Sequence, residues 1–126
     1  MITEDYVSLE TAKLLKEKRF DQNCPTYHLR GNIFRHYHAE IIPKGEPIFA
    51  APTQSVASKW IREVHNLNIE VYRTATGYIA CVVKIPSGTD LKFLETDGDD
   101  LASGTYTTYE KAFEAGIQYC LNNLIK

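Results

Sequence analysis

The sequence predicts an α+β fold in which an antiparallel sheet, made from two hairpins, carries three helices mainly on one face. Three segments have apolar residues at helical spacing, and each begins with a hydroxyl side chain suited to an N-cap. Two other segments join short β-prone runs through a glycine-containing turn, which is typical of hairpins. The elements therefore follow one another in the order α-β-β-α-β-β-α.

The first helix is predicted to begin at Ser8 and to end near Lys18 or Arg19. Ser8 is a favourable N-cap, and Glu10 lies in the first turn, where the helix dipole stabilises a carboxylate. Apolar residues recur on one face of this helix: Leu9, Ala12 and Leu15.

A hairpin is predicted over residues 26–40, closed by a two-residue turn at Gly31 and Asn32. Glycine at the first turn position favours a type II′ turn because it adopts a positive φ without a steric penalty. This turn would place Arg30 opposite Ile33.

The same turn decides which histidines share a face of the hairpin. With two loop residues, His36 and His38 lie on one face and His28 lies on the other. A three-residue loop would shift the register by one residue and bring His28 to the face of the other two. We favour the two-residue loop.

The second helix is predicted to start after Thr53 and to stop near His65 and Asn66, following a connecting loop over 43–52. Trp60 belongs to its apolar stripe and is expected to pack in the core. The stripe consists of Val56, Ala57, Trp60, Ile61 and Val64.

The second hairpin is predicted over 69–74 and 78–85, with a turn at 75–77. Its return strand is apolar on both faces, as expected of a central strand. Residues 91–94 are predicted to add a short edge strand, followed by an acidic loop over 95–104.

The third helix is predicted to begin with a capping box, in which Thr107 is the N-cap and Glu110 reaches back to it. Gly116 lies inside this helix at a cost of about 1 kcal/mol relative to Ala. We therefore expect another element to pack closely against it. The apolar stripe consists of Phe113, Ile117, Cys120, Leu121 and Leu124.

Length and composition favour a single domain spanning residues 1–126. The chain is 44% hydrophobic and 24% charged, with a formal net charge of −2, which is ordinary for a soluble globular domain. This charge argues against non-specific binding to nucleic acids or membranes, which needs excess Lys and Arg.

No apolar run approaches the roughly 20 residues of a membrane span, and the first residues lack a signal-peptide pattern. We expect a cytoplasmic protein.

The three cysteines are an odd number at wide spacing, which predicts free thiols rather than a disulfide framework. Cys81 and Cys120 have apolar surroundings and are expected to be buried. Cys24 precedes Pro25 in a predicted turn and is the candidate for an exposed thiol.

Two histidines form the only recognisable pair of metal ligands in the sequence. His36 and His38 are two residues apart on a predicted strand, so both imidazoles point to one side. With Cys24 and His28 they match no zinc-finger or zinc-ribbon spacing. We predict no metal; if one is bound, His36 and His38 are its ligands.

The charge is unevenly distributed along the chain. Residues 26–45 contain three cationic side chains and three histidines, whereas residues 88–104 contain five acidic side chains against one lysine. The simplest interpretation is two solvated regions. The two blocks are also complementary, and we assign Arg30, Arg35 and Tyr37 as candidate interaction residues. Nucleic-acid binding through this basic block is disfavoured by the net charge.

Three blocks of the sequence carry a resemblance to known proteins. They are VSLETAKLLKEKRFD at 7–21, APTQSVASKWIREVH at 51–65 with IEVY at 69–72, and YEKAFEAG at 109–116 with LNNLI at 121–125. Together they resemble a group of small uncharacterised proteins from gut Bacteroidetes and their phages and integrated elements. Arg19 departs from the group, which tends to have Gly at this helix end. The resemblance implies a mobile-element context and assigns no activity.

We therefore expect a small non-enzymatic cytoplasmic interaction protein that binds another protein or a second copy of itself. No catalytic residue and no cofactor are assigned. The alternative is a metal-binding protein or small enzyme that uses His36 and His38, together with Cys24, His28 or the acidic loop.

Overall fold

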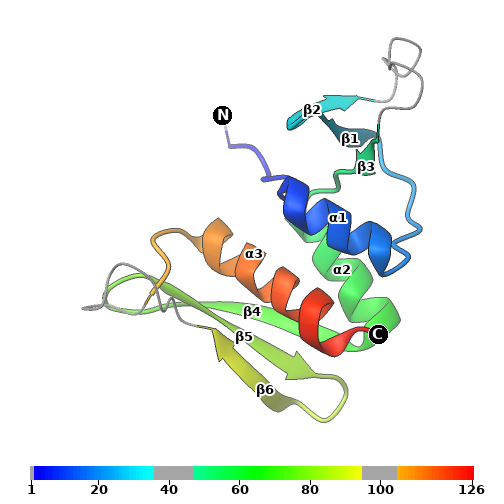
Figure 1. Cartoon of the computed structure of the whole chain (residues 1–126). Helices are drawn as coiled ribbons and strands as arrows, with labels where there is room; N and C mark the ends of the chain where they lie inside the picture. Colours follow the sequence, from blue (N-terminus) through cyan, green and yellow to red (C-terminus); the bar gives the residue numbers. More distant parts are fainter. Residues whose placement is uncertain (1, 36–46, 95–104) are drawn as a thin grey trace.

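Three helices lie between two small antiparallel sheets in the computed structural model, which describes residues 2–35, 47–94 and 105–126 (Figure 1). The helices are α1 (Leu9–Glu17), α2 (Gln54–His65) and α3 (Tyr109–Tyr119), the last of which continues into a π-helical turn (Cys120–Leu124). The first sheet has the order β2 (Asn32–Arg35), β1 (Thr26–Leu29), β3 (Phe49–Ala50). The second has the order β4 (Leu67–Arg73), β5 (Tyr78–Lys84), β6 (Thr89–Leu94).

The predicted α+β class, with three helices and two antiparallel hairpins, is confirmed. The two hairpins lie in separate sheets, and each gains a third strand. β6 is the predicted edge strand, lengthened to Thr89, and β5 is the central strand of its sheet, as expected. β3 lies in the segment predicted to be a loop, where Tyr27 of β1 pairs with Ala50. This pairing joins residues far apart in sequence, so no local pattern predicted it.

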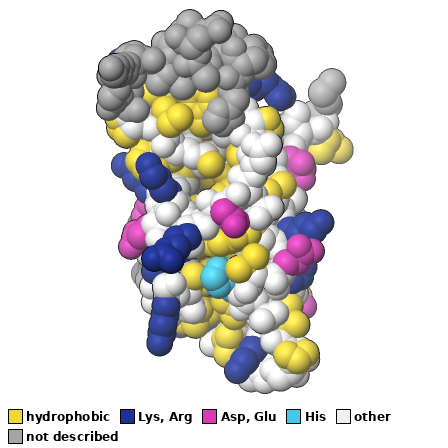
Figure 2. Space-filling view, turned by 90° about the vertical axis from the view of Figure 1, so that its right-hand side faces the viewer, with side chains coloured by type: hydrophobic (Ala, Val, Ile, Leu, Met, Phe, Trp, Pro, Cys, Tyr) yellow, Lys and Arg dark blue, Asp and Glu magenta, His cyan; other side chains and the backbone are white. Residues whose placement is uncertain are grey.

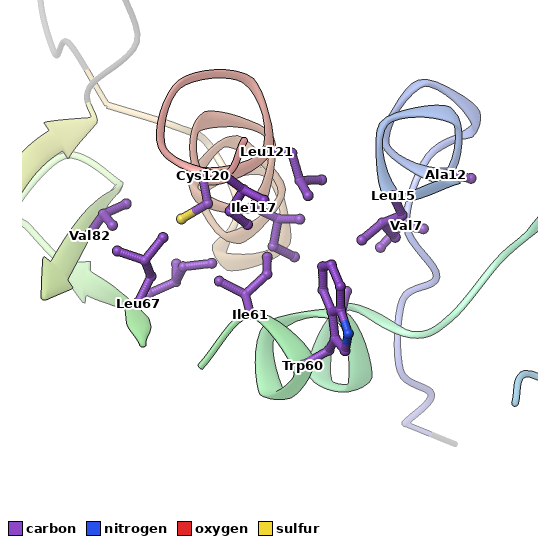
Figure 3. Close-up of a cluster of buried hydrophobic side chains, with 13 residues drawn as sticks. Val7, Ala12, Leu15, Trp60, Ile61, Leu67, Val82, Ile117, Cys120 and Leu121 are labelled. Carbon is purple, nitrogen blue, oxygen red and sulfur yellow. The ribbon is translucent and has the colours of Figure 1, made fainter. Parts of the chain in front are cut away.

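The hydrophobic core lies where the three helices meet the inner face of β4 and β5 (Figure 3). Trp60 and Ile61 of α2 and Ile117 of α3 are all buried there, as the helical spacing predicted. Val56 and Val64, predicted in the same stripe, are instead 44% and 55% exposed. They lie on the flank of α2, outside the arc against which its neighbours pack.

The helix starts follow the predicted capping chemistry, with one correction. The side chains of Ser8 and Thr53 accept hydrogen bonds from the third amides of α1 and α2. For α3 the cap is Thr108 rather than Thr107, because the Thr108 hydroxyl accepts from the Lys111 amide at 3.1 Å. The Thr107 hydroxyl is 3.2 Å from the Lys111 ammonium group instead.

The end of α1 has the geometry usually built with glycine. Arg19 follows the helix with φ +66°, in the left-handed region. The Phe20 amide donates to the Leu15 carbonyl (2.9 Å) and the Arg19 amide to the Lys16 carbonyl (3.1 Å), which is a Schellman motif. A non-glycine residue therefore holds a strained position here.

Gly116 marks the closest approach between α3 and the second sheet. A Cβ atom at this position would be 2.6 Å from Cγ2 of Ile69 and 3.6 Å from Cβ of Ala80. The expectation that another element packs closely on Gly116 is confirmed, and β4 is that element.

The turn of the first hairpin lies one residue earlier than predicted. Leu29 pairs with Asn32, so the loop residues are Arg30 and Gly31, with φ +53° and +82°. Two positive φ values define a type I′ turn rather than type II′. The loop keeps its predicted length of two residues, so the alternation of faces is unchanged, and His28 shares its face with Ile33 across the pair.

Within the ranges that the structure describes, no helix is both long and apolar enough to cross a membrane.

Candidate interaction surfaces

One face of the second sheet carries an apolar centre with an acidic rim. Side chains of Ile69, Ala80 and Val82 point toward α3 and the core, so the alternate residues point to the opposite side. We call this opposite side the open face. Its residues are Asn68, Glu70, Tyr72, Ile79, Cys81, Val83, Asp90 and Phe93.

The strand register arranges these residues in rows across the open face. Ile79, Cys81 and Val83 form an apolar line along the central strand. Tyr72 is paired with Ile79 on one side, and Phe93 is paired with Cys81 on the other. The remaining positions on the two outer strands are polar: Asn68, Glu70 and Asp90.

The aromatic side chains of the open face are in contact with solvent. Tyr72 is 44% exposed and Phe93 is 52% exposed, while Ile79 and Val83 are half-buried and Cys81 is fully buried beneath them. Of the described helices, α2 and α3 pack against the sheet, and α3 lies on its opposite side (Figure 1). Large exposed aromatics grouped on one face are typical of protein interaction sites.

Glu70 and Asp90, which form the acidic rim, help to raise the pKa values of two neighbouring side chains. Glu70 accepts hydrogen bonds from Asn68 Nδ2 (3.3 Å) and from the Tyr72 hydroxyl. The hydrogen bond to Glu70 stabilises the protonated phenol and raises the pKa of Tyr72 to about 12. Burial, reinforced by Asp90, raises the pKa of Cys81 to about 11, and its thiol lies 3.6 Å from Asp90 Oδ1. Cys81 is therefore a protonated thiol at neutral pH and a poor nucleophile.

The free edge of β6 is a less favourable docking site than the open face. The pairing between β5 and β6 shifts between Val82 and Val83, which leaves Leu91 as an extra residue in β6. The neighbouring position is occupied by exposed Lys92. Bulges and edge lysines are the features by which natural sheets resist pairing with another strand.

A second exposed group lies on the β1–β2 hairpin, at the opposite end of the molecule (Figure 1). Ile33 is 41% exposed, and Arg30 at the turn and Arg35 at the end of β2 are also exposed. We call Arg30, Ile33 and Arg35 the hairpin surface. It combines an apolar centre with two cations, and Ile33 also lines a hollow that contains Glu4 and Asp5.

Of the predicted interaction residues, Arg30 and Arg35 belong to this hairpin surface. Tyr37 lies outside the described residues, as do His36 and His38 of the hypothetical metal site. The acidic loop 95–104 also lies outside them, so its role stays a prediction.

The two remaining members of the metal hypothesis each have another partner. Cys24 is buried rather than exposed, and its thiol donates to the Thr26 carbonyl at 3.2 Å. His28 is buried, and its Nε2 donates to the Val7 carbonyl at 2.8 Å. Within the described ranges, no group of three or more His, Cys, Asp or Glu residues is arranged to hold a metal ion.

A polar cluster joining the first and last helices was not predicted. The Glu114 carboxylate accepts from the Ser8 amide (3.0 Å), from the Thr11 hydroxyl and from Gln54 Nε2 (2.9 Å). Gln118 Nε2 donates to the Thr11 hydroxyl at 3.0 Å. Because these bonds connect α1, α2 and α3, the carboxylate positions the helices and complements the N-terminal dipole of α1. More than a hundred residues separate Thr11 from Glu114, so sequence periodicity carried no signal of this contact.

Comparison with known proteins gives no relative for this chain. No protein-family model, no curated protein and no solved structure matches it. The resemblance to small proteins of Bacteroidetes and their mobile elements stays a prediction.

Proposed function

We propose that this chain is a non-enzymatic interaction protein that assembles with copies of itself. In this assembly the hairpin surface of one copy docks on the open face of the next. The observation that carries the proposal is the complementarity of the two surfaces. One has exposed Tyr72 and Phe93 beside acidic Glu70 and Asp90, and the other has exposed Ile33 beside two arginines.

The position of the two surfaces favours a head-to-tail contact. They lie at opposite ends of the molecule (Figure 1), so one copy can offer both at once. A contact between different surfaces repeats from copy to copy, and it ends only when a ring closes. The assembly therefore grows beyond a dimer as the protein concentration rises.

The size of the open face predicts a weak contact. Its three strands are about 4.8 Å apart and rise about 3.4 Å per residue. The seven residues of β4 and β5 thus give a face of roughly 14 by 24 Å. The area of this face is thus roughly 340 Å², whereas a stable complex buries about 800 Å² on each partner. We therefore expect a dissociation constant of roughly micromolar or weaker.

The cysteines support a reducing compartment such as the cytoplasm as the site of this assembly. Cys24, Cys81 and Cys120 are free and buried, and free thiols persist where glutathione and thioredoxin keep them reduced. An origin in phages or mobile elements rests on the sequence resemblance alone.

Two substitutions each disrupt one of the two surfaces of the proposed contact. Arg35→Glu places a carboxylate in the hairpin surface, opposite the acidic rim, and Phe93→Ser removes the more exposed of the two aromatic side chains of the open face. Each variant alone keeps one functional surface and should be monomeric. A mixture of the two still contains one intact pair of surfaces, so it should form a 1:1 dimer that does not grow further.

Sedimentation velocity over a range of protein concentrations distinguishes the monomer, the 1:1 dimer and larger assemblies. Val64→Ser is the matched control, since Val64 is 55% exposed on α2 and lies outside both surfaces. It should assemble like the unmodified chain, and added salt should weaken the assembly because it screens the charge pairs. A chain that stays monomeric at millimolar concentration contradicts self-assembly. Assembly that persists in both variants places the contact elsewhere.

A further inference from the structure

A cavity between α1 and the first sheet has a different chemistry from the two interaction surfaces. Its volume is about 260 Å³, and it is lined by residues of α1, by Phe20 just beyond the end of α1, and by residues of β1, of β3 and just before β3. The lining residues are Ala12, Leu15, Lys16, Phe20, Tyr27, Ile48 and Ala50. All except Lys16 present largely apolar side chains, so the interior of the cavity favours an apolar ligand.

One lysine brings positive charge to this cavity, and a second lies near it on α1. Lys16 lines it, and its ammonium group is 5.1 Å from the centre of the Phe49 ring. Lys13, one turn earlier on α1, has its ammonium group 5.7 Å from the same ring. The Phe49 ring thus gathers both cations at the junction of α1 and β3. On the face seen in Figure 2, hydrophobic side chains are interspersed with Lys and Arg and with Asp and Glu side chains.

We propose that this cavity binds a small apolar anion, with its hydrocarbon part inside and its carboxylate at Lys16. Charge complementarity at the rim selects the anion, and the apolar walls select the tail. An apolar cavity of about 150 Å³ accommodates benzene, so the volume here suits roughly ten non-hydrogen atoms. A medium-chain carboxylate such as octanoate has this size.

The chain contains its own reporter of this site. Phe20 lines the cavity, and its ring centre is 5.2 Å from that of Trp60, in an edge-on arrangement. Trp60 is the only tryptophan in the sequence. A ligand that displaces Phe20 therefore changes the fluorescence of a single, known residue.

The test compares octanoate with octanol, which has the same tail and no charge. Titration followed by Trp60 fluorescence, and checked by calorimetry, should show octanoate binding about fivefold more tightly, as expected for an exposed charge pair. Lys16→Met should remove this preference, while Lys59→Met, which deletes an exposed lysine of α2, should preserve it. Ala50→Leu fills part of the cavity and should weaken the binding of both ligands.

Three results would overturn the proposal. The first is the absence of octanoate binding at millimolar concentration. The second is equal affinity for octanol and octanoate, since the charge of Lys16 would then contribute nothing to selection. The third is binding that Ala50→Leu leaves unchanged in a folded variant, because the ligand would then occupy another place. Lys16 is exposed, so Lys16→Met remains informative even where Ala50→Leu does not fold.

Discussion

Replacing Gly116 with Ala opposes two effects of similar size, and the structure predicts which one prevails. Alanine stabilises the interior of a helix by about 1 kcal/mol relative to glycine. The new Cβ atom would be only 2.6 Å from Cγ2 of Ile69. Ile69 is β-branched and buried, so its methyl group cannot rotate away freely. Overpacking of this kind costs about 1–3 kcal/mol, and we expect a net loss of up to about 2 kcal/mol.

The same substitution should change sign when the obstructing methyl group is absent. Ile69→Ala alone should destabilise the protein by about 2–5 kcal/mol, because it leaves a cavity. In that background Gly116→Ala gains the helix propensity without the clash, so it should stabilise by about 1 kcal/mol. Ala115→Gly, at the neighbouring position of α3, is the control for propensity. It should cost about 1 kcal/mol in both backgrounds.

Urea unfolding followed by Trp60 fluorescence measures all of these variants on one scale. The comparison uses the midpoint and the slope of each transition, so that a change in the unfolded state is recognised. If Gly116→Ala stabilised the unmodified chain as much as it stabilised the Ile69→Ala variant, the close contact between α3 and β4 would be refuted.

Other predictions concern a helix end, a histidine and the thiols. Arg19→Gly should stabilise the protein by about 1 kcal/mol in urea unfolding, because glycine adopts the left-handed conformation without strain. Burial lowers the pKa of His65 from 6.5, so the unfolded chain binds this proton more readily. Stability should be highest above about pH 6.5 and should fall below it, and His65→Phe should reduce that fall. Burial raises the pKa of Cys81 to about 11 and that of Cys120 to about 12. Ellman's reagent at pH 8 should therefore react with the native thiols far more slowly than with the unfolded chain.

Each of these has a clear contrary result. Arg19→Ala keeps the positive φ and removes the side chain, so a gain as large as that of Arg19→Gly would mean that strain is not the cause. An unchanged pH dependence in His65→Phe would assign the acid sensitivity to another group. A native thiol that reacts within the mixing time would contradict the burial of the cysteines.

The sequence predicted those features that depend on neighbouring residues. Ser8 and Thr53 cap helices through bonds to amides three residues away, and the cost of Gly116 inside a helix indicated a close neighbour. The error at the first turn was small for the same reason. Gly31 was recognised as a turn residue, but Arg30 also adopts a positive φ, which nothing in its chemistry favours.

Features that depend on tertiary contacts were predicted only in part. The β5 strand is apolar on both sides, which correctly indicated a central strand, but burial on both sides was the ordinary expectation. In the structure, Ile79 and Val83 lie on the open face and are only half-buried. The basic block that holds Arg30 and Arg35 was visible as a run of charge, whereas the acidic rim of the open face depends on cross-strand pairing, which places Glu70 and Asp90 on either side of the central strand.

The hydrogen bonds between Glu114 and both Ser8 and Thr11 have a consequence for folding during synthesis, because α1 needs a side chain of α3 to complete its contacts. α1 is made before α3, yet its N-terminus is hydrogen-bonded by a side chain of α3, across more than a hundred residues. Contacts of such long sequence separation form slowly, because the chain loses the entropy of loop closure before the contact contributes favourable free energy. These contacts of α1 therefore form only after α3 has been synthesised. Fragments that end before α3 should remain unfolded and accessible to proteases, even though they contain two of the helices and both hairpins.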